Sequence, residues 1–365
     1  MNPFFRTLGI MPLVAFMFGL FASLLHAQGP GKTITPATRI WAKDNLFAWC
    51  VVPFDAKHRN SEQRAEMFNR LGIKSFAYDW RAKDIPTFDQ EIETMKSHHI
   101  KIIAWWFPYD ADDPGAKATL ETFKKHDIHP LLWVIQSVHG MPANQEEWAK
   151  YLPAGMKMPT SPEETAALSP EGKEAVRKAY AAVNEKLNGP TESPAEQEAR
   201  VQETAVRIQA LEKLANEYGT KVDLYNHNGW FGEEDNELAV LARLKTMGVT
   251  DVGMVYNFSH LRDSTHDDTK IFPEIWPKIK DHVVAVNVTG IDSKGHEAYP
   301  SQGDSDMMLM RTIQDSGWHG PVGIIAEKGG DAEETLRNYI IGVNWIGNEL
   351  KNPGSGGPAP FPPAQ

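Results

Sequence analysis

The feature that most constrains the fold is a regular alternation of short apolar runs with longer helical patterns. The runs contain many β-branched and aromatic residues without polar interruption, which is typical of strands buried on both faces of a parallel sheet. Eight such runs occur, at residues 46–52, 75–78, 102–107, 131–135, 222–225, 252–256, 283–288 and 322–326. The segments between them, such as 204–218 and 236–247, repeat apolar residues at a spacing near 3.6. Glycines after four helical patterns predict left-handed helix ends: Gly72, Gly219, Gly248 and Gly317.

Eight strand–helix repeats predict a parallel eight-stranded closed sheet, the (β/α)8 or TIM barrel, in the α/β class. An open doubly wound sheet is the alternative. No glycine-rich phosphate loop follows the first run, which argues against that alternative and against a nucleotide cofactor. We expect the barrel to span residues 40–350 as one domain.

Two segments depart from the repeat. Residues 139–194 form a long polar insertion after the fourth run, with a predicted helix over 172–187. Both a lid over the catalytic face and a plain surface insertion are compatible with it. Residues 353–365 are rich in proline and glycine and predict a disordered tail.

The N-terminus carries the pattern of an export signal. Arg6 precedes an apolar run over residues 8–25, and Ala27 supplies a small residue at the expected cleavage point. The run is short for a membrane span, although a retained anchor is the alternative. We therefore predict a signal peptide at residues 1–27, a secreted or periplasmic mature chain, and no membrane association after cleavage.

The net charge and the cysteine content limit the classes of partner and of covalent cross-link that the chain can have. The net charge of −11 provides no basic surface for a phosphate backbone, so we expect no nucleic-acid partner. Cys50 is the single cysteine, which excludes an intrachain disulfide. Because Cys50 lies within an apolar run, we interpret it as a buried structural thiol. The oligomeric state is left open.

Polar and aromatic side chains gather where the predicted strands end. In a barrel, the C-terminal ends of the strands carry the functional groups. Asparagine, histidine and acidic residues follow nearly every run, at Asp79, 226–228, 257–260, Asn287 and Glu327. Tryptophans lie at the same ends, and their faces could pack on the apolar faces of a sugar, with core packing as the alternative. The tryptophans assigned to substrate binding are Trp49, Trp80, Trp106 and Trp230.

From the fifth run onward these residues resemble the motifs of xylose isomerase-like barrels, the sugar phosphate isomerase/epimerase-like family. Residues 224–230 resemble the Glu-Asn-His-Gly-Gly segment of that family, and 257–260 resemble its Asp-x-x-His. Asn287 falls where the family has a histidine. Residues 302–304 and 315–322 resemble the last strand–helix unit, which a metal-binding glutamate follows in the family. The resemblance covers residues 46–350.

The resemblance implies one divalent metal held by Glu, Asp, His and Glu, which would be Mn, Co, Mg or Zn. At those positions this chain has Tyr225, Asn257, Asn287 and Ile325, with Glu327 two residues later. Neutral asparagine is a poorer ligand for a divalent cation than a carboxylate. A three-ligand site of His227, His260 and Glu327 and the loss of the metal site both remain open.

Three function classes follow. The first is a sugar isomerase, epimerase or keto-sugar lyase that abstracts a proton next to a carbonyl. Its candidate acid/base residues are Asp79, Glu233, His260 and Glu327, and its candidate hydroxyl ligands are Asn226, His227, Asn257 and Asn287. The second is a glycoside hydrolase, which needs two carboxylates about 5 Å or about 6.5–9.5 Å apart. The third is a non-catalytic sugar-binding barrel. In each case we expect a carbohydrate ligand.

Overall fold

The computed structural model describes most of the chain beyond its first 38 residues. The described ranges are 39–135, 144–160, 162–191, 193–227, 229–261, 268–292, 296–326 and 330–362. The predicted signal peptide and Glu327 lie outside them, so both stay predictions. None of the helices in these ranges is long and apolar enough to cross a membrane.

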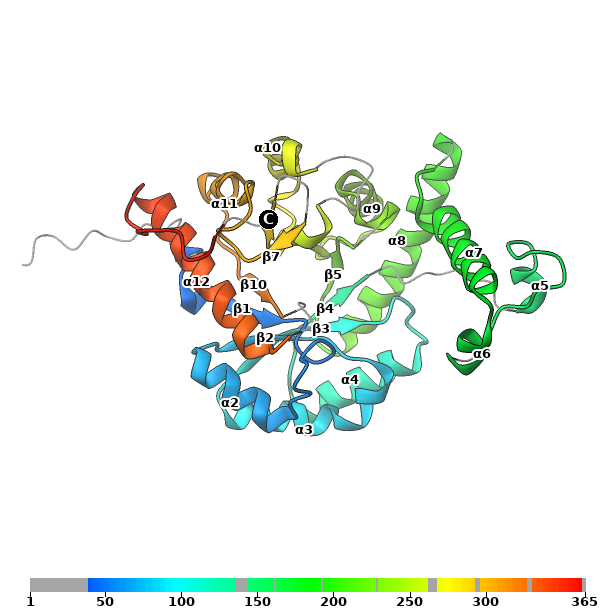
Figure 1. The fold of residues 1–365 in the computed structure, drawn as a ribbon, viewed down its shortest axis with the longest axis horizontal. Helices are drawn as coiled ribbons and strands as arrows, with labels where there is room; N and C mark the ends of the chain where they lie inside the picture. Colours follow the sequence, from blue (N-terminus) through cyan, green and yellow to red (C-terminus); the bar gives the residue numbers. More distant parts are fainter. Residues whose placement is uncertain are drawn as a thin grey trace, which may run out of the picture. The chain divides into compact units, whose positions relative to one another are not determined.

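Eight parallel strands close into a barrel in the order β1-β10-β7-β6-β5-β4-β3-β2 (Figure 1). The closing pair is β1 with β10, in which Leu46 lies opposite Val322 and Trp49 opposite Ile325. The predicted strand positions are confirmed to within about three residues. The strands are β1 (Leu46–Trp49), β2 (Ser75–Tyr78), β3 (Lys101–Phe107), β4 (Leu131–Val134), β5 (Val222–Tyr225), β6 (Gly253–Asn257), β7 (Val283–Val288) and β10 (Val322–Ile325).

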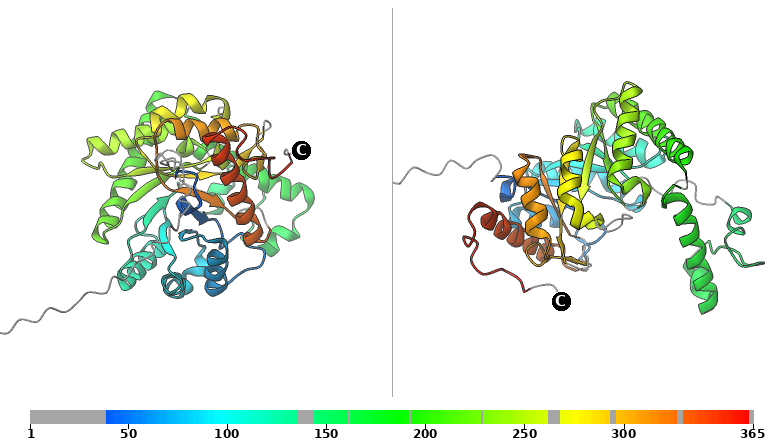
Figure 2. Two further views of the ribbon diagram at one scale, coloured as in Figure 1. Left: turned by 90° about the vertical axis from the view of Figure 1, so that its left-hand side faces the viewer. Right: turned by 90° about the horizontal axis from the view of Figure 1, so that it is seen from above.

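A helix follows each barrel strand, and the views in Figures 1 and 2 show these helices around the strands. They are α2 (Ser61–Leu71), α3 (Phe88–Ser97), α4 (Pro114–His126), α8 (Pro194–Glu217), α9 (Glu234–Thr246), α10 (Asp268–Ile279), α11 (Asp306–Asp315) and α12 (Ala332–Lys351). Helix α2 shows how the local sequence sets the start and the end of a helix. Asn60 and Gln63 form a capping box at its start, and Gly72 ends it with φ of 71°. The other three glycines predicted to end helices also have positive φ.

Strand alternation divides the aromatic residues between the inside and the outside of the barrel. Tyr78 and Trp105 point outward and pack against Phe88 of α3, and Trp105 also contacts Phe123 of α4. Phe47 and Trp133 point inward, with ring centroids 5.8 Å apart. Trp105 and Trp133 therefore fill the core.

The segment between β4 and β5 contains three helices before α8: α5 (Gln145–Trp148), α6 (Pro162–Ala167) and α7 (Pro170–Asn188). The helix predicted over 172–187 corresponds to α7. The segment has a small apolar core of its own, which includes Trp148, Leu152 and Val183. It is therefore a folded insertion, and its lid role stays a prediction.

The structure differs from the prediction in two further places. A two-stranded sheet of β8 (Gly290–Ile291) and β9 (Glu297–Ala298) follows β7, and its strands are too short to leave a sequence pattern. The tail, predicted to be disordered, is packed over residues 353–362. Phe361 contacts Tyr299 with ring centroids 5.4 Å apart, and the Trp345 indole donates a hydrogen bond to the carbonyl of Gly357. Proline and glycine exclude regular structure but not packing.

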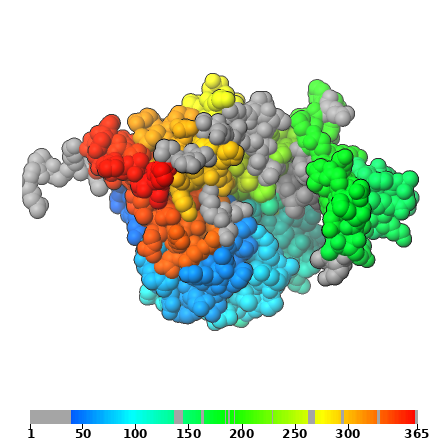
Figure 3. Space-filling model, viewed as in Figure 1, coloured from blue at the N-terminus to red at the C-terminus, as the bar shows by residue number. Residues whose placement is uncertain are grey.

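The first and last strand–helix units lie side by side, although they are far apart in the sequence. In Figure 3 the residues of α2, in blue, lie next to those of the last unit, in orange. Arg70 of α2 and Glu333 of α12 form an ion pair at 2.8 Å across this junction. The barrel is thus closed by its helices as well as by its strands.

Candidate active site

A cavity of about 490 Å³ opens at the C-terminal ends of strands β1 to β6. This volume is in the range of pockets for small molecules. Its lining residues include Trp49, Cys50, Phe54, Asp79, Trp80, Arg81, Trp106, Tyr109, Tyr225, His227 and His260. Six residues proposed from the sequence as site residues are therefore brought together here: Trp49, Asp79, Trp80, Trp106, His227 and His260. Their roles stay predictions.

Asp79 follows β2 directly and points into the barrel. Its side chain is 1% exposed. The backbone N–H groups of Asp79 and Val52 lie near the carboxyl, yet neither carboxyl oxygen forms a hydrogen bond of standard geometry. Burial raises the pKa of Asp79 to about 7, against the opposing effect of the Arg81 charge. A carboxyl with a pKa near neutrality can both accept and donate a proton at physiological pH.

Aromatic rings form much of the cavity wall. Trp49 and Trp106 stack with centroids 6.2 Å apart and an interplanar angle of 27°. The Tyr225 ring contacts both, at 5.6 Å from Trp49 and 4.7 Å from Trp106. The Trp80 indole donates a hydrogen bond to the carbonyl of Trp106 at 2.7 Å, which fixes its orientation. By contrast, the buried indole N–H groups of Trp49 and Trp106 have no hydrogen-bond partner among the described residues.

Two histidines lie together on the side of the cavity formed by β5 and β6. The His227 and His260 rings have centroids 4.4 Å apart, and His260 also contacts Tyr225 at 6.3 Å. Both rings are half-buried. Histidine in this setting can hold or move a proton, or donate a hydrogen bond to a developing oxyanion.

The positions that bind metal in xylose isomerase-like barrels do not fit a divalent cation here. Tyr225 accepts a hydrogen bond from the Asn287 amide at 3.3 Å, and the Asn257 side chain accepts one from the backbone of Ser259 at 3.1 Å. These groups are neutral and bound to each other or to the backbone, and Ile325 is apolar. Within the described residues, no three His, Cys, Asp or Glu side chains are grouped so that they could hold a metal ion. The three-ligand hypothesis depends on Glu327, outside those residues.

Several predicted site residues lie outside the residues that line the cavity. Trp230 packs under Arg200 of α8 and donates a hydrogen bond to Gln197 at 2.6 Å, so these contacts hold it away from the cavity lining, and its assignment to substrate binding stays a prediction. Glu233 is the N-cap residue of α9. Asn226 accepts a hydrogen bond from the backbone N–H of Asn257 at 2.7 Å and so joins β5 to β6.

Asn257 and Asn287 are also buried away from that lining. Their exposed fractions are 1% and 0%. Asparagine after a strand satisfies neighbouring backbone and side-chain groups as readily as it binds a ligand. Asn226, Asn257 and Asn287 thus hold the strand ends together, while Asn257 Nδ2 and Asn287 Oδ1 have no hydrogen-bond partner among the described residues. Their predicted roles in holding sugar hydroxyls stay predictions.

Tyr225, Arg81 and Cys50 line the cavity but were not selected from the sequence. Tyr225 was considered only as a lost metal ligand, although its inward position follows from strand alternation. Arg81 stands two residues after Asp79, at the strand end where a functional group was expected. Cys50, interpreted as a structural thiol, is buried and also faces the cavity.

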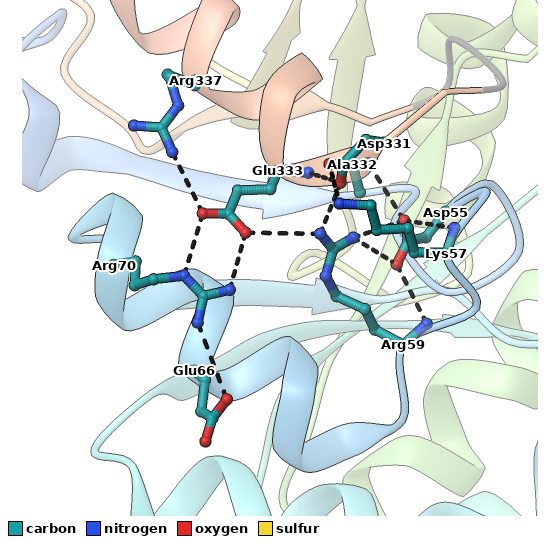
Figure 4. Close-up of polar contacts among 9 residues, drawn as sticks. All are labelled: Asp55, Lys57, Arg59, Glu66, Arg70, Asp331, Ala332, Glu333 and Arg337. Atoms are coloured by element: carbon teal, nitrogen blue, oxygen red, sulfur yellow. Dashed lines mark hydrogen bonds and ion pairs between the residues drawn. The ribbon is translucent and has the colours of Figure 1, made fainter.

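An ion-pair network joins the two loops at the seam of the barrel (Figure 4). Arg59 binds both oxygens of Asp55 at 2.7 and 2.9 Å and one oxygen of Asp331 at 2.6 Å. The backbone N–H of Ala332 also donates to Asp55 at 3.2 Å. We call Asp55, Arg59 and Asp331 the seam clamp. It ties the segment that carries the cavity residue Phe54 to the start of α12.

Comparison with known proteins gives likenesses of structure only. The chain matches no protein-family model and no curated protein. It is similar to a solved xylose isomerase domain-containing protein from Salmonella typhimurium, with 11% identity over 82% of this chain and 96% of that chain and a TM-score of 0.48. It is similar to a xylose isomerase-like TIM barrel protein from Mycobacterium smegmatis in complex with magnesium, with 12% identity over 84% and 97% and a TM-score of 0.47.

A third similar structure is a D-allulose 3-epimerase from a Methylomonas species, with 10% identity over 82% of this chain and 97% of that chain and a TM-score of 0.47. At these identities the likeness concerns the fold and not the reaction. The barrel itself is established by the closed parallel strand order.

Proposed function

We propose that this protein binds a carbohydrate in the tryptophan-lined cavity and moves a proton at a carbon next to the sugar carbonyl, with Asp79 as the acid/base group. The observation that carries this proposal is the state of Asp79. It is a buried carboxyl without hydrogen bonds of standard geometry, in a cavity of small-molecule size, with a pKa raised by burial to about 7. Glu237 is also a buried carboxyl without a hydrogen-bond partner among the described residues, but it is not among the residues that line the cavity. The position of Asp79 at the cavity is therefore what makes it the functional candidate.

The walls of the cavity support a sugar as the ligand. Sugar rings combine apolar C–H faces with hydroxyl groups, and the cavity combines the faces of Trp49, Trp80 and Trp106 with polar groups. We also propose that residues 1–27 direct export. An exported chain would meet unphosphorylated sugars or oxidised sugars released from glycans.

Proton abstraction next to a carbonyl creates an enolate, whose negative charge needs stabilisation. Hydrogen-bond donors preorganised in a dry site supply this stabilisation. In this proposal His260 and the neighbouring His227 donate to the carbonyl oxygen while Asp79 takes the proton. Because the neutral groups at the metal positions do not fit a cation, no step of this proposal depends on one.

The same cavity argues against glycoside hydrolysis. Among the described residues that line it, Asp79 is the single carboxylate. The sequence pairs Glu327 with either Asp79 or Glu233 for this reaction. Glu233 occupies the N-cap position of α9 and is not among the residues that line the cavity. Both pairs include Glu327, outside the described residues, and stay predictions.

Hydrogen exchange tests the proposal without knowledge of the product. The purified chain is incubated in D2O with a panel of aldoses, ketoses and uronic acids, and deuterium at the carbon next to the carbonyl is followed by NMR. We expect catalysed exchange with at least one sugar, and its persistence in excess chelator. Asp79→Asn, which keeps the shape of the side chain, should lower the exchange rate by at least about a hundredfold.

Asp44→Asn provides the matched control, because Asp44 is exposed, at 75% for its side chain, and precedes β1. It should leave the exchange rate unchanged. Sugar binding without exchange in the unmodified chain would instead establish a binding barrel. Exchange that survives Asp79→Asn would refute the assigned role.

A further inference from the structure

Arg81 stands at the rim of the cavity, and its guanidinium has no acidic partner among the described residues, although its backbone N–H donates to the Asp84 carboxylate at 2.8 Å. Its guanidinium donates one hydrogen bond to the carbonyl of Trp80 at 2.9 Å and lies over the Phe54 ring at 5.8 Å. It forms no ion pair with any described residue, in contrast to the paired arginines of the seam clamp and of α2. The two contacts orient the side chain while leaving other N–H groups of the guanidinium for a ligand.

The negative net charge of the chain makes an unpaired arginine at the cavity a specific sign of anion binding. The chain carries a net charge of −11, so its overall electrostatic field would repel an anion. Among the described residues that line the cavity, Arg81 is the single arginine or lysine. An exposed cation at the mouth of a pocket attracts an anion locally, and a planar guanidinium matches a carboxylate with two parallel hydrogen bonds.

The cavity also offers donors without acceptors. The indole N–H groups of Trp49 and Trp106 are buried and unpartnered, and both residues line the cavity. Because these nitrogen atoms are shielded from solvent, a ligand would accept hydrogen bonds from them only after the rings shift. The unmatched groups of the cavity-lining residues are therefore two buried indole donors, the buried Asp79 carboxyl and the exposed guanidinium of Arg81.

Resting on the proposed function, we infer that the substrate is a sugar acid whose carboxylate pairs with Arg81 while its ring lies against the tryptophans. A phosphate is less well matched, because phosphate sites usually combine several cations or backbone N–H groups. Arg81 is one cation, and Asp79 shares the cavity with it. A carboxylate carries a single charge and fits one guanidinium.

Arg81 and Asp79 are also coupled. The charge of Arg81 lowers the pKa of Asp79, against the larger effect of burial. When a substrate carboxylate neutralises Arg81, this lowering is offset and Asp79 holds its proton more firmly. Recognition of the acid group would in this way make the ionised Asp79 a stronger base for the proton that it takes from the substrate.

Paired ligands provide the test. Binding to the full chain is measured by tryptophan fluorescence and calorimetry with glucose and glucuronate, galactose and galacturonate, and mannose and mannuronate. We expect at least one acid to bind about tenfold more tightly than its neutral partner, which corresponds to about 1.4 kcal/mol. In Arg81→Gln this preference should disappear. Lys83→Gln, which removes an exposed charge two residues away, should keep it.

The outcomes separate the two proposals. Equal affinity for acid and neutral sugars, or a preference that survives Arg81→Gln, would overturn the inference and leave the proposed function standing. If glucose 6-phosphate bound more tightly than glucuronate, the preferred anionic group would be a phosphate and not a carboxylate, which would also overturn the inference. If no sugar of the panel binds, both proposals fail.

Discussion

Replacing Arg59 with alanine should lower the free energy of unfolding by about 3 kcal/mol. The Arg59 side chain is 8% exposed and its partner Asp55 1% exposed, so the substitution leaves a buried carboxylate without its counter-ion. Breaking a buried ion pair in this way costs about 3–5 kcal/mol. Asp55 keeps hydrogen bonds from the backbone of Lys57, Arg59 and Ala332, which places the expected cost at the lower end.

Urea unfolding followed by tryptophan fluorescence measures this cost. With a slope of about 3 kcal/mol per M, the midpoint should fall by about 1 M. Arg70→Ala is the matched control, because Arg70 belongs to the same network but is 52% exposed. Exposed pairs contribute about 0–1 kcal/mol, so the control should shift the midpoint by no more than about 0.3 M. Equal shifts for Arg59→Ala and Arg70→Ala would refute the reasoning that burial decides the cost.

Three further predictions address single side chains. The catalysed exchange rate should fall as the pH drops below about 7, because Asp79 becomes protonated, and a limb near pH 4 in the rate profile would contradict this assignment. Burial and the charge of Glu234 raise the pKa of Glu237 in the folded protein. The stability that Glu237 contributes is therefore fully present below about pH 4.3, the pKa of glutamate in the unfolded chain. It is lost as the pH rises, by about 1.4 kcal/mol per pH unit while folded Glu237 stays protonated. Glu237→Gln should flatten this slope in melting temperatures between pH 5 and 8, and an unchanged slope would count against it. Gly323→Ala should destabilise by about 1–3 kcal/mol, since its Cβ would lie 1.9 Å from the Asn287 amide oxygen, and an unchanged melting temperature would show that the site relaxes.

The barrel could be predicted from the sequence because its strands are buried on both faces. Such strands appear as continuous apolar runs, and each was predicted close to its observed position, as Val222–Tyr225 and Val283–Val288 show. The β8–β9 hairpin was missed because two-residue strands carry no periodicity. The packing of Phe361 on Tyr299 was missed because composition predicts the absence of helix and strand, and not the absence of contacts.

The candidate site could be predicted in part. The end of a strand fixes how far along the barrel axis a side chain lies, but it does not fix whether that side chain points into the cavity. Asp79 directly follows β2 and Trp106 lies in β3, and both side chains point inward and line the cavity. Trp230 and Glu233 lie a few residues beyond β5, in the turn that leads to α9. Trp230 packs there, and Glu233 occupies the N-cap position of the helix. No spacing rule distinguishes these cases without the loop conformation.

The neutral side chains of Tyr225, Asn257 and Asn287 and the raised pKa of Asp79 belong to one electrostatic arrangement. A set of carboxylates around a cation would keep each carboxylate ionised, because the positive charge lowers its pKa. Here Tyr225, Asn257 and Asn287 bring no charge into the barrel. Burial therefore raises the pKa of Asp79 against the Arg81 charge and the smaller lowering effects of nearby backbone N–H groups and of Arg64. The pKa consequently reaches the range in which a single carboxyl can serve as acid and base. Restoring a carboxylate by Asn257→Asp should therefore raise the pKa of Asp79 further, and a rate profile displaced to higher pH would show that the neutral positions set the pH range of the site.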